Sequence, residues 1–409
     1  MPRPALDPVR RRLLGSALGA AALAPWSALS LAAGPGSGAA GERRFVFVIL
    51  RGGLDALSAV PALGDPAFAA ARGVLAPQAG TALPLDGVFG LHPALAQLHA
   101  MYGRGELAVV HAVGLPYRQR SHFDAQQVLE SGAARPYEID TGWLGRSQSS
   151  RGSTSVALAT AVPLVLRGPG AVDTWAPSVL PEPGADLVAR LGRMYANDPA
   201  LAQALARARA LHLDAALAGD ALADDAMEAG KAAPLAPGGF VALARRAAEF
   251  LVRPDGPQVA VLDLGGWDTH ASQAAPNGAL ARNLRLLDTG LAALRQGLLA
   301  GDTWQRSVVV VATEFGREVA VNGTLGTDHG TGGAAFVLGG AVAGARVLAD
   351  WPGLAPRDRY EGRDLRTTTD LRAVLKGVLA DHLQVASQRL DREIFPDSAA
   401  VPRLSLLRG

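Results

Sequence analysis

The stretch that decides the fold, residues 307–340, reads SVVVVATEFGREVAVNGTLGTDHGTGGAAFVLGG. It begins with an apolar run, SVVVVA, and ends with another, AAFVLGG. Short continuous apolar runs of this kind predict strands that are buried on both faces of a sheet. Glu314, Asp328 and His329 lie between the two runs among many glycines. The sequence therefore places acidic and imidazole side chains directly after its most apolar strand.

Further apolar runs predict additional strands at FVFVIL (45–50), ELAVVHAVG (106–114), PLVLRG (163–168) and QVAVLDLGG (258–266). A helical segment is expected near 92–105, and residues 279–301 form a strongly amphipathic helix that ends at a glycine. Strands that alternate with helices predict βαβ units. The fold class is therefore α/β, a doubly wound, mainly parallel sheet flanked by helices. Residues 41–409 would form this domain, with a helical insertion at about 185–250.

Composition limits the partners. The chain has 409 residues, and its 39 basic and 37 acidic residues nearly cancel, so no nucleic-acid partner is expected. Three arginines, Arg10 to Arg12, precede a weakly apolar Ala/Leu/Gly segment. This pattern predicts a twin-arginine export signal in residues 1–40, with the twin-arginine translocase as a partner and a periplasmic or secreted location. The alternative is an N-terminal membrane anchor; no later apolar run is long enough to span a membrane.

The chain contains no cysteine, so disulfides and thiolate metal sites are excluded. Any metal must be bound by His, Asp or Glu. Three predicted strands deliver such residues at their ends: Asp55 after the first, Asp263, Asp268 and His270 after 258–264, and Glu314 after 307–313. Converging carboxylates raise one another's pKa unless they share a cation. A divalent metal at the carboxyl edge of the sheet explains this pattern.

Each of these residues also has a structural interpretation. Asp55 could be a turn residue or a helix N-cap, and Asp263 a buried structural acid. Asp268 and His270 could cap their loop, Glu314 could pair with Arg317, and Asp328 with His329 could close a glycine-rich turn. A separate candidate is Ser121 in RQRSHFDAQ (118–126), a nucleophile toward phosphate or sulfate esters. Its alternative is the N-cap of the helix at 122–130. Ser121 stands among Arg118, Arg120 and His122. Structural or surface positions are expected for His92, His99, His111, His212 and His382.

Several motifs together resemble a known family. In chain order they are LRGGLDAL (50–57), LHPALAQL (91–98), ELAVVHAVGLPYRQRSHFDAQ (106–126), TGWLGR (141–146), DLGGWDTH (263–270), VVVVATEFGREVAVNG (308–323) and GTDHGTGGAAFVLGG (326–340). With the export signal they resemble the twin-arginine-exported bacterial family catalogued as domain of unknown function 1501, over almost the whole mature chain. That family in turn resembles the alkaline phosphatase superfamily, whose doubly wound α/β sheet carries two metals at its carboxyl end.

The resemblance implies roles by position. Asp55 resembles the metal ligand after the first strand, and Ser121 the nucleophile at the start of a helix. The remaining ligands are implied at Asp263, Asp268, His270, Glu314 and His329. Two departures stand out. His270 follows Asp268 by two positions, where phosphatases place their histidine four later. Phe315 occupies the place of a histidine, so one metal site would be altered unless Asp328 compensates.

The sequence thus predicts an exported, metal-dependent hydrolase of phosphate esters, with sulfate esters second because no formylglycine motif is present. Asp55, Asp263, Asp268, His270, Glu314, Asp328 and His329 would hold one or two divalent ions, zinc or manganese before calcium or magnesium. Ser121 or a metal-bound water would be the nucleophile, and Arg51 or Arg120 would grip the nonbridging oxygens. The substrate would be a small-molecule or polysaccharide ester. The alternative is a catalytically degenerate binding or assembly protein at the cell envelope.

Overall fold

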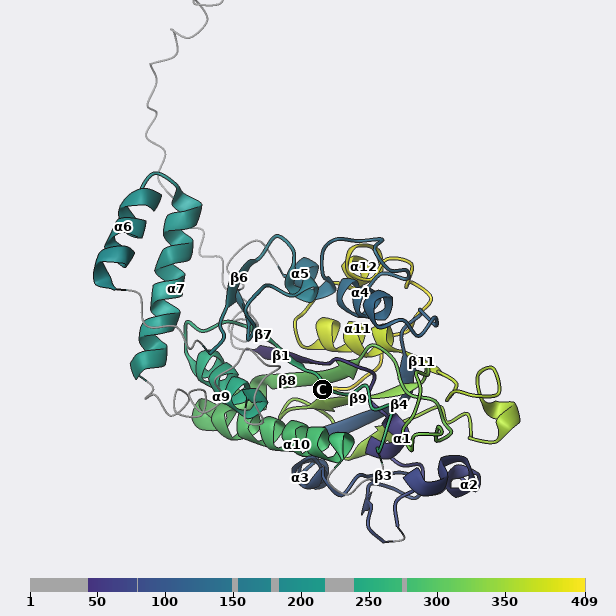
Figure 1. Ribbon diagram of the computed structural model, residues 1–409. Helices are drawn as coiled ribbons and strands as arrows, with labels where there is room; N and C mark the ends of the chain where they lie inside the picture. Colours follow the sequence, from purple (N-terminus) through teal and green to yellow (C-terminus); the bar gives the residue numbers. More distant parts are fainter. Residues whose placement is uncertain are drawn as a thin grey trace, which may run out of the picture. The chain divides into compact units, whose positions relative to one another are not determined.

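The computed structural model describes residues 43–78, 80–148, 154–177, 184–217, 239–273 and 278–408. Within them lies a nine-stranded sheet (Figure 1). Its strands are β1 (Arg44–Leu50), β4 (Leu107–Gly114), β5 (Thr154–Ala157), β6 (Ala171–Thr174), β7 (Val259–Leu264), β8 (Ser307–Thr313), β9 (Gly333–Leu338), β10 (Arg346–Leu348) and β11 (Thr369–Asp370). Their order is β10-β4-β9-β8-β1-β7-β5-β6, with β11 beside β4.

The sheet is mainly parallel, as the sequence predicts. The pairings β1–β7, β1–β8, β5–β7, β5–β6, β4–β10 and β4–β11 are parallel. Only β9 among these strands runs the other way, antiparallel to both β4 and β8. It follows β8 through a loop and not through a crossover helix, and such a connection returns the chain antiparallel.

The central strands are buried on both faces. In β1, Val46, Val48 and Leu50 belong to one hydrophobic core, whereas Phe47 and Ile49 belong to a second core on the opposite face. Side chains alternate between faces along a strand, so a strand covered on both sides reads as a continuous apolar run. Full burial of each such side chain stabilises the fold by roughly 1.5–3 kcal/mol.

Helices cover both faces (Figure 1). The first core is closed by α1 (Ala56–Ala59), α2 (Phe68–Arg72), α3 (Ala96–Gly103), α9 (Gly239–Val252) and α10 (Ala279–Leu298). The second is closed by α4 (His122–Ser131), α5 (Trp143–Ser147) and α11 (Leu371–Asp381), with the short α12 (Ser387–Arg389) on the same side. A two-stranded antiparallel pair, β2 (Leu83–Pro84) and β3 (Gly90–Leu91), follows α2. The predicted helices near 92–105 and at 279–301 correspond to α3 and α10.

Glycines allow α10 to pack closely on α9. A Cβ added to Gly290 would lie 2.4 Å from a ring carbon of Phe240, and one added to Gly297 would lie 2.5 Å from Cβ of Ala248. Real Cβ contacts do not become this short, so neither position can accommodate a side chain and both require glycine. The two helices can therefore press their apolar faces together over β7.

The segment at 185–250 contains two kinds of helix. The pair α6 (Ala185–Tyr195) and α7 (Pro199–Leu217) is an addition to the layers: α6 buries none of its residues. An ion pair of 2.9 Å between Arg207 of α7 and Asp173 connects this pair to β6. By contrast, α9 lies in the layer itself, because Phe240, Leu243 and their neighbours belong to the first core.

One predicted strand is a turn. Residues 163–168 contain a short 3₁₀ helix, Leu164–Leu166, in place of a strand. The backbone N–H of Val165 donates to the Glu130 carboxylate, and the carbonyl of Arg167 accepts from Gly142. These partners satisfy the backbone without a neighbouring strand, so the apolar run was not sufficient evidence for one.

The predicted export signal, residues 1–40, lies outside the described residues. Of the helices that the structure describes, none combines the length and the apolar character that a membrane crossing requires.

Candidate metal centre

The candidate site lies at the carboxyl edge of the sheet. Because β1, β4, β7 and β8 are parallel, their last residues, Leu50, Gly114, Leu264 and Thr313, meet at this edge. Ligands of open α/β sheets bind at such edges. The loops that follow these four strands carry the polar residues of the site.

The loop from β8 to β9 folds into a narrow hairpin. Arg317 and His329 form an antiparallel bridge, and the N–H of Gly330 donates to the carbonyl of Gly316 at 2.9 Å. A Cβ added to Gly316 would lie 1.8 Å from the carbonyl oxygen of Gly332, so only glycine fits there. The glycines therefore let the chain return closely enough to place His329 beside the end of β8, next to Glu314.

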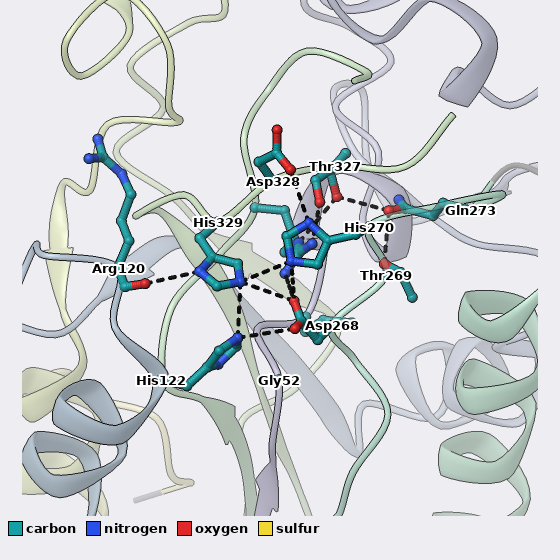
Figure 2. Close-up of polar contacts among 12 residues, drawn as sticks. Gly52, Arg120, His122, Asp268, Thr269, His270, Gln273, Thr327, Asp328 and His329 are labelled. Carbon is teal, nitrogen blue, oxygen red and sulfur yellow. Dashed lines mark hydrogen bonds and ion pairs between the residues drawn. The ribbon is translucent and has the colours of Figure 1, made fainter. Parts of the chain in front are cut away.

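Three imidazoles and one carboxylate converge at this edge (Figure 2). Nε2 of His329 lies 3.0 Å from Nε2 of His122 and 3.1 Å from Nε2 of His270. The Oδ1 atom of Asp268 lies 2.9 Å from Nε2 of His270 and 3.1 Å from Nε2 of His329. Its Oδ2 atom lies 3.5 Å from Nε2 of His122.

The other nitrogen of each ring fixes the tautomer. Nδ1 of His122 lies 2.8 Å from Oε1 of Glu314, and Nδ1 of His270 lies 2.9 Å from Oδ1 of Asp328. Nδ1 of His329 lies 3.0 Å from the carbonyl oxygen of Arg120. These oxygens only accept, so each Nδ1 carries the hydrogen, and in a neutral imidazole Nε2 then presents a lone pair.

Four acceptor atoms thus point at one another: three Nε2 lone pairs and an oxygen of Asp268. The guanidinium of Arg317 donates to that oxygen from 2.5 Å, but it does not contact the nitrogens. The repulsion within such a group is relieved by a proton on one ring or by a cation between its members. Two Zn–N bonds of about 2.0–2.1 Å at a tetrahedral angle would separate the nitrogens by about 3.3 Å, close to the spacings found here. The donor set therefore fits a divalent metal.

Electrostatics favour the metal-binding protonation states of Asp268 and His329, whereas they favour the protonated form of His122. Burial raises the pKa of Asp268, but the hydrogen bond and charge of Arg317 outweigh it, so the pKa is lowered overall. Burial lowers the pKa of His329, and the neighbouring charge of His122 lowers it further. The hydrogen bond to Glu314 is the main cause of the raised pKa of His122. An ionised Asp268 and a neutral His329 are the forms that bind metals.

The cluster is open to solvent on one side. The side chains of Asp268 and His270 are 43% and 44% exposed, whereas Glu314 is buried behind His122. Among the described residues, the ligand atoms of His122, Asp268 and His329 form the one group of three or more that lies within metal-binding distance. A small molecule could reach this group from the side of Asp268 and His270.

The structure brings together five of the residues predicted from sequence: Asp268, His270, Glu314, Asp328 and His329. Their positions differ. Asp268, His270 and His329 point their donor atoms at the common centre, whereas Glu314 and Asp328 hold the far nitrogens of two of the rings. Oxygen atoms that receive the Nδ1–H of a ligating histidine are a regular feature of metal sites.

Asp55 lies apart from the imidazoles. Its Oδ1 atom accepts from the backbone of Leu57 and Ser58, which makes it the N-cap of α1. Its Oδ2 atom is engaged by the side chains of Arg72, Ser58 and Gln273. The N-cap interpretation therefore describes this residue, and we do not include it in the ligand set.

Arg51 and Asp263 form a separate polar group. The Arg51 guanidinium donates to Glu130 at 2.8 Å, to Gln126 at 3.2 Å and to Asp263 at 3.2 Å. Burial raises the pKa of Asp263 despite the charge of Arg51. These two residues thus neutralise each other beside the site, and we do not include Asp263 among the ligands.

Ser121 begins α4 directly before His122, as its N-cap interpretation requires, although its side chain makes no capping hydrogen bond. The backbone of Arg120 has a positive φ of 59°, and its carbonyl receives Nδ1–H of His329. The Arg120 guanidinium extends away from the imidazoles (Figure 2) and pairs with Asp364 at 2.7 Å and Glu361 at 2.6 Å. It is not free to grip a substrate.

His122 is the member of the cluster that the sequence interpretation missed. It follows a seven-residue loop after β4 and was considered only as a neighbour of Ser121. The signal available was its position at the start of a helix that begins at the carboxyl edge of the sheet. Phe315, the residue after Glu314, packs against His122 and His329 with ring centroids 4.7 and 5.1 Å away. An apolar ring therefore occupies this side of the centre.

The comparisons with known proteins show to which family the chain belongs and which solved structures are similar to it. Solved structures similar to this chain include the lipoteichoic acid synthase LtaP from Listeria monocytogenes (9% identity, 88% of this chain and 76% of that chain, TM-score 0.41). They also include a phosphonate monoester hydrolase of Agrobacterium radiobacter (12%, 84% and 74%, 0.40) and a protein in the alkaline phosphatase superfamily from Vibrio parahaemolyticus (9%, 83% and 66%, 0.39). At these TM-scores the likenesses carry no argument about activity. No curated protein matches the chain.

The class defined by the coordinates is a mainly parallel α/β protein with a histidine-rich cluster at its carboxyl edge. Residues 47–394 match the family described as "Protein of unknown function (DUF1501)", and the chain belongs to that family. The resemblance of the sequence motifs to this family is thereby confirmed, and the twin-arginine signal stays a prediction.

Proposed function

We propose that this protein is an exported, metal-dependent hydrolase of phosphate esters, with sulfate esters as the second class. The observation that carries the proposal is the convergence of three Nε2 lone pairs and the Asp268 carboxylate, each ring being fixed in the required tautomer. The exposed side of the cluster supports a catalytic site, because an ester could approach the cation there.

The roles follow from the contacts. His122, Asp268, His270 and His329 would hold one divalent cation, and Glu314 and Asp328 would keep two of the rings oriented. Imidazole and carboxylate donors suit zinc or manganese. When bound, such a cation supplies a Lewis acid for the oxygens of an ester.

Ser121 is the proposed nucleophile. It stands between Arg120 and His122, both of which contact the cluster, and it begins a ten-residue helix whose N-terminus favours anions. The Tyr117 hydroxyl donates to Asp124 at 2.8 Å in the first turn of this helix. If Ser121→Ala retains full turnover, a water molecule is the nucleophile and Ser121 only begins the helix.

The function is tested with the purified, metal-loaded protein on a panel of phosphate monoesters, phosphate diesters and sulfate esters. We expect metal-dependent turnover of at least one phosphate ester and a loss of more than a hundredfold in Asp268→Ala. Ester turnover that is unchanged in Asp268→Ala would contradict the proposal. Export is tested separately: Arg11→Lys with Arg12→Lys should retain the chain in the cytoplasm.

The second candidate is a binding or assembly protein that keeps the fold without turnover. Two observations favour it: Phe315 packs against the imidazoles where the superfamily would place a histidine, and both arginines predicted to grip oxygens are neutralised by carboxylates. Stoichiometric metal with no hydrolysis across the ester panel would select this candidate.

A further inference from the structure

The arginines at this edge of the sheet differ in whether a carboxylate forms an ion pair with them. Four of them donate to carboxylates: Arg51 to Glu130 and Asp263, Arg120 to Asp364 and Glu361, Arg317 to Asp268, and Arg363 to Glu318. Arg118 is different. Within the part of the chain that the structure describes, no hydrogen-bond acceptor and no ion-pair partner of its guanidinium is found.

Arg118 nevertheless lies in a partly buried position, four residues before His122. Burial lowers its pKa, and the carboxylate that most opposes this effect is Asp370. That carboxylate is already used: it caps α11 and accepts from the side chain of Arg372 at 2.7 Å. Asp370 and Tyr360 thus act on Arg118 electrostatically, but among the described residues no carboxylate forms an ion pair with it.

The Arg118 guanidinium lies beside Gly114 at the end of β4. A Cβ added to Gly114, the last residue of β4, would lie 3.2 Å from Nη1 of Arg118 and 3.0 Å from Oγ1 of Thr367. The same point lies 3.2 Å from the carbonyl of Thr331, two residues along the chain from His329. Oγ1 of Thr367 is enclosed and has no partner among the described residues, whereas the nitrogens of Arg118 are not enclosed. The guanidinium therefore lies at the end of β4, and its N–H groups have no hydrogen-bond acceptor among the described residues.

We propose that Arg118 binds the oxyanion of the substrate, a phosphate or sulfate group. The inference rests on the proposed function and names the residue that would recognise the anionic part of the ester. A partly buried charge without a partner costs free energy that an incoming anion relieves. A guanidinium presents planar N–H donors that match two oxygens of a phosphate or sulfate. Arg118 thereby replaces Arg51 and Arg120, which the sequence indicated for this role.

The first experiment maps the reaction of phenylglyoxal with the arginines of the intact protein by peptide mass spectrometry. Arg118 should react faster than Arg51, Arg120 and Arg317, whose donors are engaged. Inorganic phosphate should slow labelling of Arg118 at concentrations at which chloride of equal ionic strength does not. Equal protection by chloride, or no protection, would overturn the proposal.

The second experiment measures binding of inorganic phosphate by calorimetry. Arg118→Ala should weaken binding about tenfold or more, and Arg118→Lys should recover part of the affinity because it keeps the charge without the planar donors. Arg403→Ala is the matched control: it removes one guanidinium charge that is paired with Asp381 at the far end of α11. Equal effects of Arg118→Ala and Arg403→Ala would contradict a specific site.

The outcomes separate this inference from the proposed function. Phosphate protection at Arg118 without ester turnover would leave the oxyanion site standing and remove the hydrolase. Turnover with the same KM in wild type and Arg118→Ala would keep the hydrolase and remove the assignment of Arg118.

Discussion

Asp268 is the residue whose carboxylate contacts all three imidazoles of the cluster. Its carboxylate lies within 3.5 Å of Nε2 of all three rings and receives the Arg317 guanidinium. In the absence of a cation, these atoms are mutually repulsive acceptors apart from that one donor. A shared cation, or a proton on one of the rings, would relieve this repulsion.

The first prediction concerns a ligand. His329→Ala removes the imidazole that lies between the other two, so the protein should lose stoichiometric metal on dialysis while wild type retains it. Plasma mass spectrometry of both proteins checks this. The matched control is His99→Ala, which removes a histidine whose Nε2 contacts only the carbonyl of Pro84 among the described residues. Retention of metal by His329→Ala would contradict the ligand set.

The second prediction concerns orientation. Asp328→Ala removes the acceptor of Nδ1–H of His270, so this ring can change tautomer or rotate. We expect metal affinity to fall about 10–100-fold, as for other partners of ligating histidines. Because the Asp328 side chain is 49% exposed, the unfolding free energy of the metal-free protein should change by less than about 0.5 kcal/mol. A competition titration with a chelator and a urea melt measure the two quantities.

At the scale of single residues, the sequence predicted Asp268, His270 and His329 for the site because each lies in a loop at a strand end. It could not distinguish Asp55, since an acid after two glycines has the same pattern whether it caps a helix or binds a metal. His122 was missed because the argument counted acids at strand ends, and its role depends on where an irregular loop returns.

Neighbouring helices and strands approach each other most closely at a few glycines. The packing of α10 on α9 has no room for a side chain at Gly297, and the hairpin from β8 to β9 has none at Gly316. The sequence predicted β1, β4, β7, β8, β9 and α10 because apolar runs and amphipathic periods are local signals. It failed at 163–168, where backbone partners from distant loops decide the conformation.

The third prediction tests the helix packing. Gly297→Ala should lower the unfolding free energy by about 1–3 kcal/mol, because the new Cβ would meet Cβ of Ala248 at 2.5 Å. Gly192→Ala is the matched control in an exposed helical position with no atom within 4 Å, and it should raise stability by up to about 1 kcal/mol. Urea melts of the two variants should therefore shift in opposite directions.

For the whole molecule, two enclosed histidines make stability depend on pH. Burial lowers the pKa of His111 and of His382 to about 4, and the Nε2–H groups donate to the carbonyls of Val60 and Arg44. In the unfolded chain a histidine titrates near 6.5, so the unfolded chain takes up protons first as the pH falls. The stability that these neutral rings contribute is complete above about pH 6.5 and is lost between there and about pH 4.

The fourth prediction follows. Between about pH 4.5 and pH 6, each of these histidines should make the unfolding free energy fall by up to about 1.4 kcal/mol per pH unit. His382→Gln removes one titrating group, so its slope should be smaller than that of wild type by about this amount. Identical slopes for wild type and His382→Gln in urea melts would refute the assignment.

The separation of the proposed ligands along the chain determines when the protein can bind its metal. His122 and His329 are 207 residues apart, and His270 and His329 are 59 apart. An unfolded chain therefore has no preassembled binding set, and selection among competing metal ions takes place where the chain folds. If export follows the twin-arginine route, which carries folded proteins, that place is the cytoplasm. The ion would then be chosen by the supply in one compartment and used in another.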